Sequence, residues 1–147
     1  MPYLKLESSD YTIYLKLEKR ELNEEWLNST IEIRDGEGQV KELKPLWYYS
    51  EPSALLSTIE NFLAKYDQQV RYELMDDPTI EFVFDNEDDD MILRLYRSFE
   101  LRDHLALYLD LTQVKYLAEY LKLFTERLPK QSEKVALLYD KGILQGD

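Results

Sequence analysis

The sequence predicts an α+β fold built mainly on antiparallel β-sheet, packed with two long amphipathic helices and a short C-terminal helix. Three observations support this fold class. Several short runs alternate apolar and polar residues, two longer stretches repeat their apolar residues every three to four positions, and the strand-like runs follow one another without intervening helices. Strands that adjoin in sequence pair in the antiparallel sense, because a parallel pair needs a long crossover connection.

Two hairpins are expected in the N-terminal part of the chain. Residues 11–18 place apolar side chains on one face and mainly polar ones on the other, which is typical of a half-buried strand, and residues 3–6 are its candidate partner. Residues 26–43 predict a strand, a tight turn and a second strand. The turn has the sequence DGEG at residues 35–38, where glycine supplies the positive-φ positions that a hairpin requires.

Two long helices are expected on either side of the central part. The first lies within residues 49–69, where Ser50 is the candidate N-cap and Pro52 falls in the first turn. The second covers residues 112–129 and ends at Pro129. Each has an apolar stripe at helical spacing, which predicts a buried face. The stripes are Leu55, Leu56, Ile59, Phe62, Leu63 and Tyr66, and then Val114, Leu117, Ala118, Leu121, Phe124 and Leu128.

Between the long helices, four strand-like runs predict an antiparallel meander. They cover residues 70–75, 79–85, 91–98 and 104–111, and an acidic stretch connects the second run to the third. The leucines of the last run are expected to face the core. The opposite phase holds Arg94, Tyr96, Ala106 and Tyr108, which either form an interface, for which Tyr and Arg are typical anchors, or lie beneath the C-terminal helix.

A short third helix is expected over residues 133–141. Ser132 is its candidate N-cap, and Gly142 closes it in the left-handed conformation with Ile143 as the hydrophobic partner. All of these elements fit a single domain over residues 1–147, with residues 130–147 as a candidate C-terminal extension.

The composition indicates a cytoplasmic protein outside the membrane. The chain contains no cysteine, which excludes disulfides and thiolate chemistry and fits a reducing compartment. The first ten residues have neither the basic segment nor the apolar region of a secretory signal, and no apolar run approaches the roughly 20 residues of a membrane span.

The residue types predict no catalytic, cofactor-binding or metal site. His104 is the only histidine, no serine stands in a nucleophile elbow, and four glycines cannot build a phosphate-binding loop. The acidic stretch also fails as an EF-hand calcium loop. If Asp85 opened the loop, Asp90 would stand at the required glycine and Tyr96 at the bidentate glutamate. The chain is therefore not expected to be an enzyme.

Negative charge is the strongest functional signal in the sequence. The formal net charge is −12, which disfavours binding to nucleic acid and to anionic membranes. Residues 72–93 hold nine carboxylates and no Lys or Arg. This stretch is either a solvated hairpin turn or a surface for a basic protein. The candidate partner-binding residues are Asp76, Asp77, Asp85, Glu87, Asp88, Asp89, Asp90, Arg94, Tyr96 and Tyr108.

Three segments resemble the WapI-type immunity family of bacterial polymorphic toxin systems. They are the strand, turn and strand of residues 26–46, the helix of residues 53–67, and residues 104–124, in which a strand runs directly into a long helix. The acidic stretch and the tail after residue 129 depart from the family pattern. The resemblance implies a non-catalytic protein that binds and neutralises a cognate toxin domain, expected to be basic and often a nuclease. The alternative is a cytoplasmic scaffold or adaptor without a toxin partner. The sequence predicts no oligomeric state.

Overall fold

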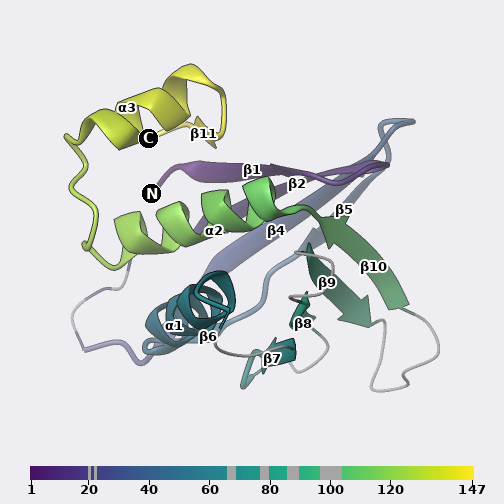
Figure 1. The fold of residues 1–147 in the computed structure, drawn as a ribbon, viewed down its shortest axis with the longest axis horizontal. Helices are drawn as coiled ribbons and strands as arrows, with labels where there is room; N and C mark the ends of the chain where they lie inside the picture. Colours follow the sequence, from purple (N-terminus) through teal and green to yellow (C-terminus); the bar gives the residue numbers. More distant parts are fainter. Residues whose placement is uncertain (20, 22, 66–68, 77–79, 86–89, 97–103) are drawn as a thin grey trace.

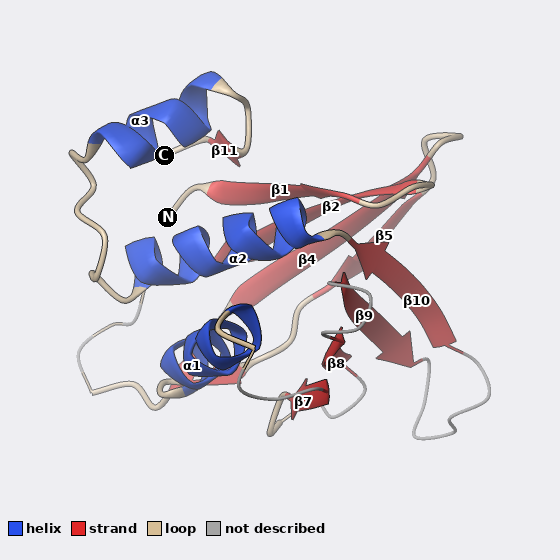
Figure 2. Ribbon diagram, viewed as in Figure 1, coloured by secondary structure: helices blue, strands red, loops and turns tan. Residues whose placement is uncertain are grey.

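A computed structural model describes residues 1–147 except residues 20, 22, 66–68, 77–79, 86–89 and 97–103. The described residues form three helices and eleven strands, and the strands are arranged in antiparallel sheets (Figures 1 and 2). The predicted α+β class is therefore confirmed.

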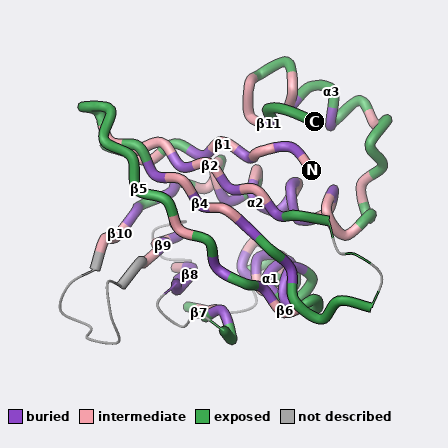
Figure 3. Tube along the Cα trace, turned by 180° about the vertical axis from the view of Figure 1, so that it is seen from behind, coloured by how far each residue is buried: buried purple, intermediate pink, exposed green. Residues whose placement is uncertain are grey.

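The first sheet has five strands and contains both predicted N-terminal hairpins. Its strands are β1 (Tyr3–Glu7), β2 (Tyr11–Leu17), β4 (Ser29–Asp35), β5 (Val40–Leu43) and β11 (Leu144–Gln145), in the order β11-β1-β2-β4-β5. The turn between β4 and β5 depends on Gly38 at φ 83° and on the Asp35 carboxylate, which accepts the N–H groups of Glu37 and Gln39, both at 2.9 Å. Figure 3, which views the molecule from behind, shows that the edge strand β5 is largely exposed.

The second sheet is the predicted meander. It consists of β7 (Gln69–Glu73), β8 (Ile80–Asp85), β9 (Asp90–Tyr96) and β10 (His104–Leu109), in the order β10-β9-β8-β7. Leu107 and Leu109 are fully buried and Leu105 packs against the core, so the predicted inner face of the last strand is confirmed.

The single strand predicted to begin at residue 26 is wrong. Trp26 and Leu27 form a separate short strand, β3 (Trp26–Leu27), which pairs with β6 (Trp47–Tyr48), and β4 begins only at Ser29. The reason is that Leu27 and its register partner Trp47 are both buried, which ties the start of the segment to β6.

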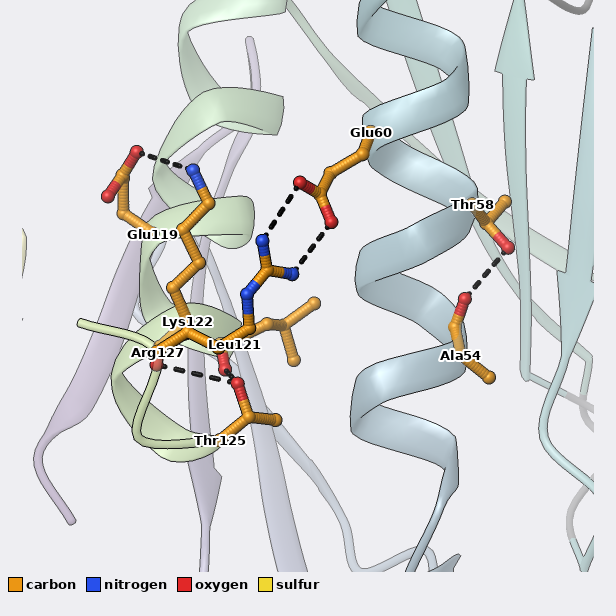
Figure 4. A network of polar contacts seen from close by, with 8 residues as sticks. All are labelled: Ala54, Thr58, Glu60, Glu119, Leu121, Lys122, Thr125 and Arg127. Atoms are coloured by element: carbon orange, nitrogen blue, oxygen red, sulfur yellow. Dashed lines mark hydrogen bonds and ion pairs between the residues drawn. The ribbon is translucent and has the colours of Figure 1, made fainter.

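The helices are α1 (Glu51–Leu63), α2 (Leu111–Phe124) and α3 (Glu133–Asp140). Helices α1 and α2 lie beside each other (Figure 1) and are joined at their C-terminal ends by a bidentate ion pair. Arg127, which follows α2, donates to the two carboxylate oxygens of Glu60 at 2.8 and 3.2 Å (Figure 4).

The ends of the two long helices differ from the prediction. Ser50 is the N-cap residue of α1, but its backbone is helical and its hydroxyl caps none of the described N–H groups. Helix α2 begins earlier than predicted, because the Asp110 carboxylate accepts the Gln113 N–H at 3.1 Å. It also ends before Pro129, since Glu126 adopts φ 62° and the Arg127 N–H turns back to the Lys122 carbonyl. The predicted stripe residue Tyr66 lies outside the described residues.

Helix α3 follows the prediction at both ends. The Ser132 hydroxyl accepts the Val135 N–H at 3.3 Å, and Gly142 has φ 74° after the last turn. The chain then forms β11, which pairs with β1 at the edge of the first sheet. Residues 130–147, the candidate extension, thus contribute a helix and an edge strand.

The core lies where the inner faces of the two sheets meet α1 and α2. A cavity of only about 10 Å³ between the layers is lined by Leu6 and Ile13 of the first sheet, Phe82 and Leu93 of the second, and Leu117 of α2. Close packing across all three layers therefore fixes the position of each sheet relative to the helices.

Candidate protein-binding surface

The predicted acidic residues fall at the hairpin between β8 and β9 and after β7. Asp85 ends β8 and Asp90 begins β9, and the two residues pair directly across the strands. Asp76 is exposed just after β7. Asp77, Glu87, Asp88 and Asp89 lie outside the described residues.

The outer face of the meander carries the other predicted residues. Tyr108 is 58% exposed on β10. Tyr96 lies on β9, where its backbone pairs with His104, and only its backbone is described. Arg94 is half-buried beside Glu81. The C-terminal helix does not cover Tyr108, so the described part of this face is open at that tyrosine.

The acidic stretch is partly neutralised by two arginines that flank it in sequence. Glu81 is 5% exposed on β8, and Arg94 Nη1 lies 3.3 Å and Arg71 Nη1 4.0 Å from its Oε1 atom. Cross-strand register explains the grouping, because β8 lies between β7 and β9. Arg94 Nε is buried and has no acceptor among the described residues. The predicted run of uncompensated charge therefore includes one carboxylate that is paired within the fold.

A second surface, not predicted from the sequence, lies at the ribbon of β3 and β6. Trp26 is 38% exposed, Leu46 37% and Tyr49 45%. The rings of Trp26 and Tyr48 pack in a T-shaped arrangement with their centroids 5.2 Å apart, and the ring centroids of Tyr48 and Tyr49 are 4.7 Å apart. We define the aromatic surface as the exposed side chains of Trp26, Leu46 and Tyr49, the half-buried Tyr48, and the exposed Met75, whose backbone N–H shares the Glu51 carboxylate with that of Tyr48.

Buried neighbours hold this ribbon in place. Trp47 is fully buried, and its Nε1–H donates to the Ser29 hydroxyl at 3.0 Å, which in turn donates to the Pro45 carbonyl at 2.6 Å. Because strand residues alternate in direction, burial of Trp47 and Leu27 turns Tyr48 and Trp26 away from the core. The rings of Trp26 and Tyr48 therefore point outward because Trp47 is buried and its Nε1–H is hydrogen-bonded.

Glu51 joins the ribbon to the end of β7. This carboxylate is 1% exposed at the first position of α1, and it accepts the Tyr48 N–H at 2.8 Å, the Tyr72 O–H at 2.9 Å and the Met75 N–H at 3.1 Å. Burial, together with the hydrogen bond to Glu51, raises the pKa of Tyr72. Met75, which is 65% exposed, thus lies across Glu51 from Tyr48, and the exposed Asp76 follows it.

Glutamates and two open pockets border the ribbon. The first pocket, of about 320 Å³, is lined by Glu24, Glu25, Trp26, Asn28 and Leu46. A second pocket of about 320 Å³ shares Glu24 and Asn28 and is also lined by Glu18, Lys19, Glu21 and Leu27. Residues 18–28 carry four glutamates against Lys19 and Arg20, so this border is acidic overall.

Only two short runs of the sequence point to this surface. Trp47, Tyr48 and Tyr49 are consecutive, and Glu24 and Glu25 directly precede Trp26. Strands of two residues show no periodicity that could separate inward from outward side chains. Only the pairing of β3 with β6 reveals that the aromatic rings come together.

The described residues contain no group of three or more His, Cys, Asp or Glu side chains that could hold a metal ion. None of the described helices has the length and apolar character to cross a membrane. Comparison of the chain with known family models, with curated proteins and with solved structures found no match.

Proposed function

We propose that this chain is a non-catalytic binding protein that docks a basic protein through the aromatic surface. Its resemblance to the WapI-type immunity family suggests that the partner is a toxin domain, which the chain neutralises by covering it. A nuclease domain would suit this role, because a surface that grips phosphates is basic and attracts a carboxylate-rich protein.

The grouping of exposed apolar side chains carries this proposal. Seven large hydrophobic side chains are exposed among the described residues, and four of them, Trp26, Leu46, Tyr49 and Met75, belong to the aromatic surface. Scattered single residues of this kind are normal on a soluble protein, whereas a group rimmed by polar residues marks an interaction site. Trp and Tyr are also the residue types that contribute most to binding energy at interfaces.

Charge supports a basic partner in particular. The net charge is −12, and glutamates border the aromatic surface on the β3 side while Asp76 follows Met75 on the other. Long-range attraction of this kind speeds encounter with a positively charged protein, and the aromatic contacts then set the lifetime of the complex.

Calorimetric titration with the toxin domain encoded by the neighbouring gene tests the proposal. Trp26→Ala and Tyr49→Ala are each expected to weaken binding by about 30-fold, the effect of losing a contact of about 2 kcal/mol. The control is Leu137→Ala, because Leu137 is 51% exposed on α3, which lies at the top of Figure 1, whereas β6 lies in the lower half beside α1. Circular dichroism of each variant checks that the fold is intact.

Three results would count against this assignment. Full affinity in both aromatic variants, with loss in Tyr108→Ala, would move the docking surface to the outer face of the meander. Absence of any binding to the toxin domain would reject neutralisation. A neighbouring gene that encodes no toxin would favour the alternative, a scaffold or adaptor protein.

A further inference from the structure

The pocket beside Trp26 has a preformed shape. Asn23 adopts φ 70° and the Glu24 N–H reaches the Glu21 carbonyl at 3.2 Å, so the chain turns sharply just before β3. The Tyr49 N–H then donates to the Glu25 carbonyl at 2.8 Å, which fastens the backbone of Glu25 to the residue after β6. Two consecutive glutamates are thereby held beside the Trp26 ring.

The walls of this pocket combine two kinds of chemistry. Glu24 and Glu25 supply carboxylates, Asn28 supplies an amide, and Trp26 and Leu46 supply apolar surface. The volume of about 320 Å³ lies at the lower end of ligand pockets, which suits one long side chain better than a drug-sized molecule. The edge contact with Tyr48 at 5.2 Å braces the Trp26 ring.

We infer that this pocket receives one arginine or lysine side chain of the basic partner, an inference that rests on the proposed function. The aliphatic stem lies along Trp26 and Leu46, as long cationic side chains do on apolar surfaces. The charged head meets the glutamates and the face of the indole, which attracts cations.

Other occupants fit these walls less well. An anion would face two carboxylates. A purely apolar side chain would shield these carboxylates from water and would offer them no hydrogen bond of its own, which is costly. The described residues provide no group of three metal ligands at this place. A second copy of the chain would carry a net charge of −12 toward an acidic border.

The two tryptophans provide a direct readout. Trp47 is fully buried and its Nε1–H is bonded to Ser29, whereas Trp26 lines the pocket. In a nitrogen–proton correlation spectrum, N-acetyl-arginine amide is expected to shift the indole signal of Trp26 and to leave that of Trp47 in place. N-acetyl-citrulline amide, which has the same shape without the charge, is expected to shift neither.

A charge-matched pair of variants isolates the pocket. Glu25→Gln is expected to weaken the affinity for N-acetyl-arginine amide by about fivefold, which is in the range of one exposed ion pair. Glu37→Gln removes the same charge at the exposed β4–β5 turn and is expected to leave the affinity for N-acetyl-arginine amide unchanged. Equal effects of the two variants would mean that only net charge acts, and would overturn the inference.

The remaining outcomes separate this inference from the proposed function. If the toxin domain requires Trp26 and Tyr49 but arginine moves no Trp26 signal, the pocket inference fails and the proposed function stands. If arginine fills the pocket but the toxin domain does not bind, the proposed function fails instead. Calcium that shifts Trp26 at lower concentration than arginine, or a dimer lost in Trp26→Ala on sedimentation, would also overturn the inference.

Discussion

The phenol of Tyr72 donates a 2.9 Å hydrogen bond to the buried carboxylate of Glu51, and so joins the first strand of the meander to the first turn of α1. The same carboxylate accepts the backbone N–H groups of Tyr48 and Met75. Three donors thus converge on the two oxygens of one buried carboxylate, so its acceptors are occupied within the fold. This arrangement positions Tyr48 and Met75, which belong to the aromatic surface, relative to each other.

Replacement of Glu51 by glutamine is expected to destabilise the fold by about 1–3 kcal/mol. Glutamine keeps the shape but offers an NH₂ group where the carboxylate oxygens accept three donors, so at least one buried donor loses its partner. Urea unfolding measures the effect. Glu37→Gln, in the exposed β4–β5 turn, is the control and should leave the free energy of unfolding unchanged. A loss in Glu51→Gln no larger than in this control would show that the network is not stabilising.

The buried hydroxyl of Tyr120 leads us to expect a loss of stability at alkaline pH. It is fully buried, its hydroxyl donates to the Pro2 carbonyl at 2.8 Å and accepts the Leu17 N–H at 3.0 Å, and burial raises its pKa. A raised folded-state pKa gives stability that is complete below the unfolded value of about 10 and is lost as the pH rises beyond it.

Tyr120→Phe tests this linkage. The variant is expected to lose about 1–3 kcal/mol near neutral pH, because two buried backbone groups lose their partner. Above about pH 10 the difference from the native chain should shrink, since phenylalanine does not ionise. Urea unfolding across this range gives both quantities. Parallel pH profiles for the two proteins would contradict the assignment.

The ion pair between Glu60 and Arg127 predicts the opposite pH dependence. The hydrogen bond from Arg127 is the main cause that lowers the pKa of Glu60, so its stabilisation is present above the unfolded value of about 4.3 and is lost as the pH falls through the lowered pKa. A double-mutant cycle with Glu60→Gln and Arg127→Gln should show favourable coupling near neutral pH. The coupling is expected to be small, because both side chains are exposed, and should vanish in acid. Coupling that persists in acid would rule out an ionic origin.

The acidic hairpin remains a predicted steering element. Changing Asp85, Glu87, Asp88, Asp89 and Asp90 to their amides is expected to slow association with the toxin domain and to flatten its salt dependence, since such attraction is screened beyond about 8 Å at physiological ionic strength. Stopped-flow association at low and high salt measures both effects. The dissociation rate should change little, in contrast to Trp26→Ala. An unaltered association rate would reject the steering role and favour the alternative, in which this segment is only a solvated turn.

The helices and hairpins could be predicted because their signals are local. Periodic apolar residues place Phe62 and Leu121 on buried faces, and both are buried. Helix ends were predicted less well. Pro129 is a strong stop signal, yet α2 ends earlier, because Glu126 adopts a left-handed conformation that the sequence pattern does not indicate.

The sequence by itself determined the α+β class, the meander and the acidic character, since these depend on composition and on the spacing of neighbouring residues. Only the tertiary structure decided which polar and aromatic residues form a site. Glu51 becomes a buried acceptor because Tyr48, Tyr72 and Met75 surround it, and Trp26 meets Tyr48 because two distant short strands pair. The physical reason is that these contacts arise from satisfying buried groups and packing whole layers, and no local pattern records which distant residue provides the partner.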